Sequence, residues 1–296
     1  MTERAADVIC FGEILWDFLP DGLHPGGAPF NAAYHLRQLG RRPRLVSAVG
    51  RDVLGDELLR RLRHWNLDPG GIARRRDRPT GIVRAALAAR GDARYEIAAG
   101  AAWDRIVLSA GTRRAAGAAR AFLFGSLAQR SAANRRALER LLAGAPAGAW
   151  FAFDVNLRPP YDDPALVRAL ARRATLLKLN AAEAARLAAG AGERPGREEG
   201  DARALAARTG CPTVCVTAGA RGAGLLRGGT WRWEPGRPVR VEDTVGAGDA
   251  FLAALIHHLL DDRLPDRAIL ARACRLGEWV ASRRGATPAY DASTPA

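Results

Sequence analysis

The chain has 296 residues, enough for one large domain or two unequal ones with an ample hydrophobic core. Hydrophobic residues make up 48% and charged residues 26%, and no apolar run is long enough to span a bilayer, so we expect a soluble, cytoplasmic protein that does not bind membranes. The net charge of +14 comes from scattered arginines without a basic tail or a nucleic-acid-binding motif, so we do not expect nucleic acid as a partner.

The first hundred residues predict the start of an α/β core and a small β insertion. Residues 7–12 predict a strand, a helix follows from near Asn31 to Gly40, and a second strand spans 44–50. An amphipathic helix is predicted at 55–68. Residues 80–99 then predict two strands joined at RGD, a hairpin signal that breaks the alternation of strands and helices.

From residue 100 onward, apolar strands alternate with helices. Strands are predicted at 121–127, 149–156, 175–180 and 213–219. Helices are predicted at 131–145, 163–174, 181–190 and 202–210, and from about 248 and 265, with a polar loop at 192–201 and a hairpin at 224–235. This order is typical of a mostly parallel sheet covered by helices on both faces. We predict an α/β core of residues 1–12, 26–79 and 100–296, and an appended, discontinuous β element of residues 13–25 and 80–99.

Open α/β sheets bind ligands beyond the carboxyl ends of their strands, so polar residues at those ends are candidate contacts. In FDVNLR (153–158), Asp154, Asn156 and Arg158 alternate with apolar residues and share one face. They either meet partners or a ligand, or mark a strand end that emerges into solvent. Lys178, the only lysine of the chain, ends the next predicted strand in the same alternating pattern.

Helix caps compete with ligand binding at three positions. Asn180, with Glu183 three residues later, predicts either a capping box or a contact to a ligand. Asn31, which follows a glycine pair at 26–27, and Asp249, which ends the GAGD turn before an apolar helix, pose the same choice. The polar residues at neighbouring strand ends are therefore needed to choose between helix capping and ligand binding.

Further signals favour phosphate chemistry without a nucleotide-binding P-loop. Thr217, Gly219 and Gly222 form a strand end and a tight turn, which either simply turns the chain or lets its backbone approach a phosphate. Asp17 is a lone carboxylate just after the first strand. The chain lacks GxxxxGK[ST] and the protein-kinase motifs, so phosphate chemistry would depend on backbone N–H groups, arginine and a metal.

Two stretches resemble the signatures of the ribokinase/phosphofructokinase-B family of sugar kinases: GGAPFN near residue 30 and DTVGAGDAF at 243–251. GEILWDFLP, AAWD and FDVNLRPP make bacterial fructokinases the most similar members. The resemblance covers nearly the whole chain. It implies a ribokinase-like α/β/α sandwich with a small β lid, and transfer of the ATP γ-phosphoryl group to a sugar hydroxyl.

The resemblance also implies roles for single residues. Asp249 matches the catalytic base, which we expect to be a weakly basic carboxylate at a helix terminus that accepts the proton as the bond to phosphorus forms. The anion hole is matched by Gly246, Ala247 and Gly248. The sugar-binding positions are matched by Asp17, Gly27 and Asn31. The element that organises Mg²⁺ through water, together with the phosphates, is matched by Asn180 and Glu183. The nucleotide-phosphate turn is matched by Thr217, Gly219 and Gly222.

Three further residues have less definite matches. Asp243 matches a residue associated with a monovalent-cation (K⁺) site, and Arg158 and Lys178 stand at strand ends that face the nucleotide in related kinases. We expect both cations to neutralise phosphate charge.

Departures from the family pattern bear on the sugar. Ala28–Pro29 replaces the lysine that ribokinases carry in the glycine-pair motif, and Ser126 and Gln129 stand where ribokinases place an acid. Both departures argue against ribose, and the similarity to bacterial fructokinases implies phosphorylation of D-fructose to fructose 6-phosphate. A kinase for 2-keto-3-deoxygluconate, ribose or a nucleoside remains an alternative, and so does a sugar-sensing regulator that has lost its base or anion hole. The short lid leaves a monomer and a homodimer formed through the lid both open.

Overall fold

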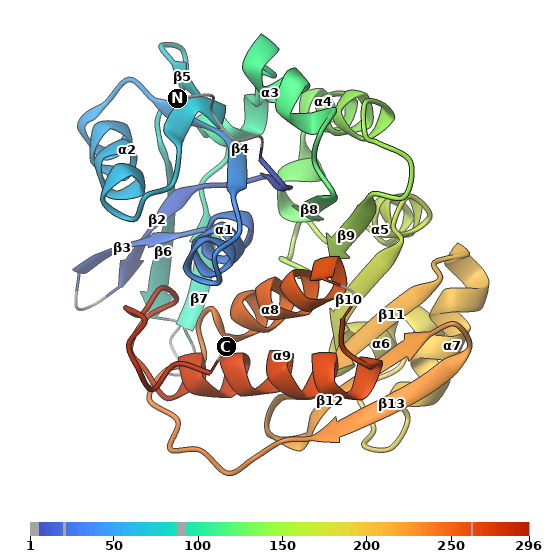
Figure 1. Ribbon diagram of the computed structural model, residues 1–296. Helices are drawn as coiled ribbons and strands as arrows, with labels where there is room; N and C mark the ends of the chain where they lie inside the picture. The colour runs from blue at the N-terminus through green and yellow to red at the C-terminus, as the bar shows by residue number, and fades with distance from the viewer. Residues whose placement is uncertain (1–5, 20–21, 88–92, 262, 296) are drawn as a thin grey trace.

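The computed structural model describes residues 6–19, 22–87, 93–261 and 263–295. Within these ranges, nine strands form one sheet in the order β13-β12-β11-β10-β9-β8-β1-β4-β5 (Figure 1). The strands from β11 to β5 in this order pair in parallel, while β12 and β13 pair antiparallel at one edge. Their bounds are Val8–Phe11 (β1), Pro43–Gly50 (β4), Ile72–Arg75 (β5), Ala121–Gly125 (β8), Trp150–Asp154 (β9), Leu176–Asn180 (β10), Thr213–Thr217 (β11), Gly222–Arg227 (β12) and Thr230–Pro235 (β13).

Helices cover both faces of the large sheet because successive strand residues point to opposite sides. Val8 and Cys10 of β1 enter one apolar core, and Ile9 and Phe11 enter the other. The first core includes residues of α1 (Ala28–Gln38), α2 (Val53–His64), α8 (Ala247–Asp261) and α9 (Asp266–Ala281). The second includes residues of α3 (Ala110–Ala116), α4 (Ala132–Ala143), α5 (Pro164–Ala171), α6 (Ala181–Ala189) and α7 (Glu198–Thr209). The predicted mostly parallel sheet with helices on both faces is therefore confirmed.

A second sheet of four strands stands beside the first, in the order β3-β2-β6-β7. It combines β2 (Leu15–Leu19) and β3 (Gly22–Gly26) with β6 (Gly81–Leu87) and β7 (Ala93–Ile97), which come from the two segments predicted as a β element. β2 pairs in parallel with β6, and the outer pairs are antiparallel. The predicted turn at RGD lies outside the described residues.

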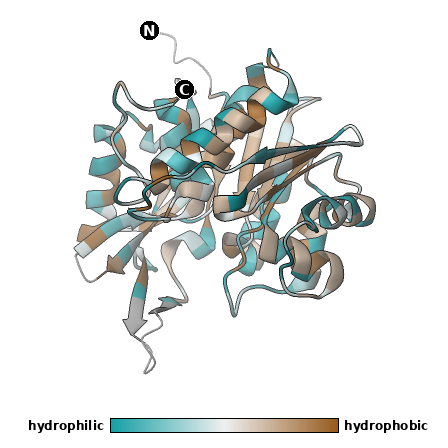
Figure 2. Cartoon of the chain, turned by 90° about the horizontal axis from the view of Figure 1, so that it is seen from below, coloured by the Kyte–Doolittle hydropathy of each residue, from teal (hydrophilic) through white to brown (hydrophobic). Residues whose placement is uncertain are grey.

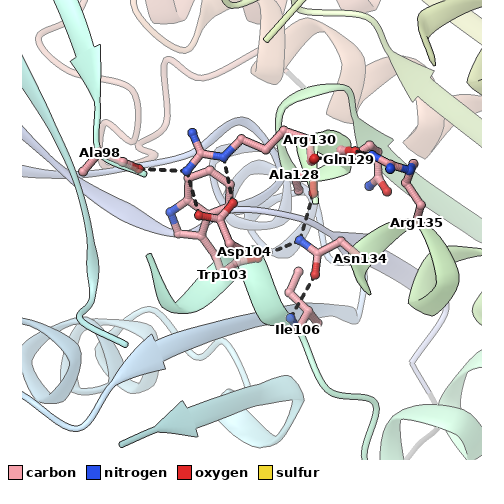
Figure 3. A network of polar contacts seen from close by, with 9 residues as sticks. All are labelled: Ala98, Trp103, Asp104, Ile106, Ala128, Gln129, Arg130, Asn134 and Arg135. Atoms are coloured by element: carbon pink, nitrogen blue, oxygen red, sulfur yellow. Dashed lines mark hydrogen bonds and ion pairs between the residues drawn. The ribbon is translucent and has the colours of Figure 1, made fainter. Parts of the chain in front are cut away.

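A buried polar network fixes the segment that leads from the second sheet back to the core (Figure 3). Arg130 makes a two-pronged ion pair with Asp104, with Nε–Oδ1 and Nη2–Oδ2 distances of 2.7 and 2.8 Å. Nη2 also donates to the carbonyl oxygen of Ala98, just beyond β7, and the guanidinium lies 4.2 Å from the ring centre of Trp103. Asn134 donates to the carbonyl oxygen of Trp103 from the neighbouring helix α4. The exit of the second sheet is thus tied to the core by an ion pair and by hydrogen bonds from Arg130 and Asn134 to backbone carbonyl oxygens.

Four elements differ clearly from the sequence prediction. α7 begins at Glu198, inside the predicted polar loop, because Glu198 is buried and forms an ion pair with Arg221. β9 ends at Asp154 instead of continuing to residue 156, since Asn156 adopts a left-handed φ of 40°. The short elements β5 and α3 were not predicted, and neither carries a long periodic pattern.

Hydropathy follows this architecture. Figure 2 shows hydrophobic colours gathered on the interior strands and inner helix faces, with hydrophilic colours on the outer turns. Among the helices of the described residues, none combines the length and the apolar character that crossing a bilayer requires.

Candidate active site

The site is built where α1 and α8 begin, beside the carboxyl ends of β9, β10 and β11. The turn before α8 requires glycine at position 246. Gly246 has a φ of 78°, and a Cβ there would lie 2.6 Å from the Cα of Ala286. The N–H of Ala247 donates weakly to the carbonyl oxygen of Thr244 at 3.3 Å. Gly248 and Asp249 follow in the first helical turn, where backbone N–H groups lack intrahelical acceptors and attract an anion.

Asp249 is held by a partner from the other end of the sequence. Its Oδ2 accepts a hydrogen bond of 2.8 Å from Nδ2 of Asn31, 218 residues away. Asn31 lies inside α1, whose N-cap is Gly27, so Asn31 is not the cap of that helix. The bond joins the glycine-pair segment to the GAGD turn. For both residues the structure therefore favours a role in the site over helix capping.

Burial, and next the charge of Asp154, raise the pKa of Asp249 to about 7, although Asp249 keeps some contact with solvent. The Asn31 hydrogen bond and the charges of Lys178 and Arg158 act in the opposite direction. The helix terminus was expected to favour the ionised form of Asp249, but desolvation outweighs the helix end and raises its pKa. A carboxylate that titrates near neutral pH is a better proton acceptor.

Lys178 forms a buried ion pair with Asp154. The two residues are register partners on the parallel strands β10 and β9, and the distance from Nζ to Oδ1 is 3.0 Å. Their side chains are 9% and 3% exposed, so the pair is shielded from water. Burial alone would lower the pKa of Lys178, but the charges of Asp154, Glu183 and Asp249 outweigh it and raise that pKa, so the amine stays protonated.

The predicted capping box at the start of α6 is present. The side chain of Asn180 accepts from the N–H of Glu183, and Oε2 of Glu183 accepts from the N–H of Asn180. Oε1 of Glu183 accepts in addition from the N–H of Leu157, in the loop after β9, at 2.7 Å. Glu183 therefore clamps the ends of β9 and β10 together. Each of its oxygens keeps a lone pair, which suits metal-bound water better than a direct metal bond.

The glycine pair is packed against the carboxylate of Asp17 and the backbone of Glu13. A Cβ at Gly26 would lie 2.0 Å from Oδ2 of Asp17, and a Cβ at Gly27, whose φ is 113°, would lie 2.5 Å from the carbonyl oxygen of Glu13. Burial raises the pKa of Asp17 to about 6, opposed by the charges of His24 and Arg158. The predicted residues Asp17, Gly27 and Asn31 thus lie on adjoining segments at one side of the site.

The predicted nucleotide side uses the turn after β11. Thr217 pairs in register with Asn180, and its hydroxyl donates to the carbonyl oxygen of Leu179 at 3.3 Å. Gly219 and Gly222 have φ values of 57° and 116°, and a Cβ at Gly222 would lie 2.0 Å from the carbonyl oxygen of Glu234. Both glycines are therefore favoured by the turn itself; Gly222 is buried against β13, whereas no atom of the described residues lies within 4 Å of a Cβ at Gly219.

Arg158 and Asp243 occupy the rim. Arg158 follows the left-handed Asn156, and its charge lowers the pKa of both Asp17 and Asp249, so it lies within electrostatic reach of both carboxylates. Asp243 accepts from the N–H of Val245 at 2.9 Å and, through its other oxygen, from the N–H of Gly285 at 3.1 Å. Asp243 therefore braces the GAGD turn against the loop at 285.

Two residues of the cluster received no specific site role from the sequence, although Asp154 was among the candidate contacts at the strand ends. The sequence placed Asp154 on the polar face of its strand. It did not indicate that Asp154 pairs with Lys178 on the neighbouring strand. Glu13, directly after β1, is 3% exposed, and among the described residues its Oε2 has no hydrogen-bond partner. Burial raises the pKa of Glu13, and the charge of Asp154 adds to this. The one sequence signal that could have identified Glu13 as a site residue was its position as a carboxylate shortly after an apolar strand.

Ser126 and Gln129, which follow β8, are both buried. Ser126 donates a long hydrogen bond of 3.4 Å to the carbonyl oxygen of Asn156. Gln129 is fully buried, and within the described part of the chain neither atom of its amide has a hydrogen-bond partner. A separate cavity of about 410 Å³ lies between the N-terminus of α2 and the residues that enter and leave the second sheet, and no predicted site residue lines it.

Metal ligands are sparse. Within the described ranges, no three His, Cys, Asp or Glu side chains gather closely enough to hold a metal ion. Mg²⁺ does not require such a cage, because it keeps several waters and is usually held by substrate phosphates with one or two carboxylates. The remaining lone pairs of Glu183 fit that mode of binding.

Comparison with known proteins agrees with this geometry. The family model described as pfkB family carbohydrate kinase matches residues 20–292. Relatives include a fructokinase of Rhizobium leguminosarum bv. trifolii, 29% identical over 87% of this chain and 81% of that protein, and fructokinase-1 of Oryza sativa subsp. japonica, 28% identical over 97% and 95%. The crystal structure of the sugar kinase PH1459 from Pyrococcus horikoshii in complex with ATP superimposes with a TM-score of 0.80 at 26% identity, covering 95% of this chain and 94% of that one.

This structural likeness confirms the predicted ribokinase-like fold. The family match extends over far more than half of the chain and includes both the glycine pair and the GAGD turn. The chain therefore belongs to the pfkB family of carbohydrate kinases and is an ATP-dependent sugar kinase.

Proposed function

We propose that the enzyme is a fructokinase that converts D-fructose and ATP to fructose 6-phosphate and ADP. The observation that carries the proposal is the hydrogen bond between Asn31 and Asp249, because it places the glycine-pair segment beside the catalytic turn. Relatives named fructokinase support fructose as the sugar. The absence of the ribokinase lysine at Ala28–Pro29 argues in the same direction.

In the proposed reaction, Asp17, Gly27 and Asn31 bind the sugar and Asp249 faces the reacting hydroxyl. The hydroxyl oxygen attacks the γ-phosphorus, the bond from that phosphorus to the bridging oxygen of ADP breaks, and the hydroxyl proton passes to Asp249. Asn31 fixes the carboxylate in the orientation that accepts this proton. The N–H groups at the start of α8, from Gly246 to Gly248, stabilise the negative charge on the transferring group.

The nucleotide would bind along the ends of β10 and β11. We propose that Asn180, Thr217, Gly219 and Gly222 contact its phosphates, and that Arg158 and Lys178 offset their charge. Mg²⁺ would be carried by the phosphates and touched through water by Glu183, and it would supply further neutralisation of the phosphoryl oxygens. Both carboxylate oxygens of Asp243 already accept a backbone hydrogen bond. A monovalent cation such as K⁺ would therefore bind Asp243 only through the remaining lone pairs of these oxygens.

We further propose that residues 13–25 and 80–99 act as a lid over the sugar, with residues 1–12, 26–79 and 100–296 as the core. Asp17 lies on β2 of this second sheet, so movement of the sheet would carry a sugar-binding residue with it. Small-molecule sugar and ATP are the partners, and the enzyme acts as a monomer or as a homodimer through the lid.

The test is ATP-dependent phosphorylation by the purified protein across fructose, ribose, 2-keto-3-deoxygluconate, tagatose and adenosine. Fructose is expected to give the highest kcat/KM, and ³¹P NMR should place the phosphate on the C6 oxygen. A higher kcat/KM for another acceptor would replace fructose as the substrate. No turnover of any acceptor by a folded protein would instead point to a sugar-sensing regulator.

A further inference from the structure

The ion pair of Asp154 and Lys178 is unusual for its position. It joins the last residue of β9 to the middle of β10, inside the sheet and directly beneath the start of α8. Taking two charges out of water is costly, and apolar residues of similar volume are often no less stable at such a place. A buried pair beside a reacting group therefore favours a functional reason for its presence.

The ammonium group of Lys178 reaches the anion-binding turn. A Cβ added at Gly248 would lie 3.2 Å from Nζ, so the lysine end packs against the first turn of α8. Gly248 does not have a left-handed φ, and in the described part of the chain Nζ of Lys178 is the only neighbouring atom within 4 Å of a Cβ placed there, so a side chain at position 248 would crowd the ammonium group. Backbone N–H groups and a fixed cation thus converge on the same small volume.

Lysine has three N–H donors on Nζ and a long flexible stem, so it needs a partner to hold it in one place. Asp154 accepts one of the three donors at 3.0 Å and lies opposite Lys178 in the β-sheet register, which fixes both ends of the contact. Two donors remain directed away from Asp154. Asp249 and Glu183 also contribute charge at Lys178, so the cation lies among three carboxylates and not against one alone.

We propose that Asp154 is a positioning residue for phosphoryl transfer: its carboxylate holds the ammonium group of Lys178 against the N-terminal turn of α8, where the two remaining donors bind the γ-phosphoryl group. Lys178 then acts as a catalytic residue, and Asp154 acts only through it. This inference rests on the proposed kinase reaction but not on the identity of the sugar.

The proposal is tested by a double-mutant cycle with Asp154→Leu and Lys178→Met. Each single change is expected to lower kcat by roughly 10- to 100-fold, because a misplaced group near the reacting atoms costs about that much. KM for the sugar should stay within about twofold. The double variant replaces the ion pair by two apolar side chains, which buried positions tolerate well, and its kcat should equal that of Lys178→Met within about threefold.

Asp154→Asn keeps an acceptor oxygen of the same shape and should recover part of the loss. Asp104→Asn is the matched control, because it breaks a second buried ion pair, with Arg130, outside this cluster. It should lower the thermal midpoint and leave the kcat pattern of the cycle unaffected. If Asp154→Leu lowers kcat as much in the Lys178→Met background as in the parent enzyme, or if it lowers kcat by less than twofold, Asp154 does not act through Lys178.

A binding measurement separates this proposal from the choice of sugar. Calorimetry with ADP and with the non-hydrolysable analogue AMP-PNP reports the contribution of the γ-phosphoryl group without turnover. The ratio of the two affinities should fall about tenfold in Lys178→Met and in Asp154→Leu, and no further in the double variant. If no sugar of the panel is phosphorylated, only the proposed acceptor is overturned. If the ratio of the AMP-PNP and ADP affinities is unchanged in Asp154→Leu, the positioning role of Asp154 is overturned.

Discussion

Two buried ion pairs in this enzyme have opposite designs. Arg130 and Asp104 form a two-pronged contact near the exit of the second sheet, with the guanidinium also stacked on Trp103 (Figure 3). Lys178 and Asp154 share a single hydrogen bond at the carboxyl ends of β10 and β9. The first pair uses planar, preorganised geometry, and each oxygen of its carboxylate accepts a hydrogen bond, while Nη1 of Arg130 has no hydrogen-bond partner among the described residues. In the second pair, Asp154 accepts only one of the three N–H donors of Lys178. The charges of Glu183 and Asp249 also act on Lys178.

The difference teaches how to separate structural from functional charge in this fold. A two-pronged pair that also packs on an aromatic ring stiffens the chain where it lies, so its removal should lower the stability of the fold. A pair that keeps unused hydrogen-bond donors beside an anion-binding turn can still bind a ligand. Its removal should therefore lower kcat. The pKa of Asp249 belongs to the second region, because the charge of Asp154 is one of the causes that raise it.

The largest effect is expected for Asp249→Asn. The amide cannot accept the hydroxyl proton, so kcat should fall by about 10³-fold or more while the affinity for sugar changes little. The same change removes a buried carboxylate whose ionisation the fold disfavours, so the free energy of unfolding at pH 7.5 should rise by roughly 1–3 kcal/mol. Steady-state kinetics and thermal unfolding of the same samples check the fall in kcat and the rise in stability. A variant that is both slower and less stable than the parent would contradict the predicted rise in stability.

Asp104→Asn should show the reverse pattern. It leaves the charge of Arg130 buried without its carboxylate partner, and the free energy of unfolding should fall by about 3 kcal/mol. Its kcat on the preferred sugar should stay within about threefold of the parent value. Denaturant unfolding and initial rates provide the comparison, and a rate loss larger than tenfold would show that the two regions are not separable as described.

These contrasts also show what a sequence can tell. The order of elements and the polar strand ends were predictable, because buried parallel strands are apolar runs and helices follow with their own period. The register that pairs Asp154 with Lys178 was not, since it depends on how two strands about 24 residues apart align. The bond from Asn31 to Asp249 spans 218 residues, and no local rule distinguishes it from helix capping. Polar segments were also misread: Glu198 starts a helix because its ion pair with Arg221 allows it to be buried.

The pH dependence sharpens the comparison further. Since the pKa of Asp249 is raised to about 7, kcat/KM should decline as the pH falls through that value, where an ordinary aspartate would decline only near pH 4. Asn31, Lys178 and Arg158 act to lower this pKa, and Asp154 acts to raise it, so Asp154→Asn should move the acid limb to lower pH. A limb that stays near pH 7 in Asp154→Asn would contradict the coupling between the two carboxylates.

The smallest expected effect concerns the C-terminal segment. His35 is buried between the hydroxyl of Tyr290 and the carbonyl oxygen of Ala286, at 2.9 Å each, so Nε2 carries the proton and Nδ1 accepts from Tyr290. Burial lowers the pKa of His35 to about 4. Stability from the neutral ring is complete above pH 6.5 and is lost as the pH falls toward 4, by roughly 1 kcal/mol at pH 5.5. Urea unfolding of the parent and His35→Gln at pH 7.5 and 5.5 should show a steeper acid loss in the parent.

The most direct test of the central claim is a single-turnover measurement of phosphoryl transfer from γ-labelled ATP to fructose, with saturating sugar and nucleotide, in the parent enzyme and Asp249→Asn. Our account predicts labelled fructose 6-phosphate from the parent, with its rate reduced about 10³-fold or more by the substitution while both ligands still bind. Transfer at an unchanged rate in Asp249→Asn would contradict the role of Asp249 as the base that this site is built around.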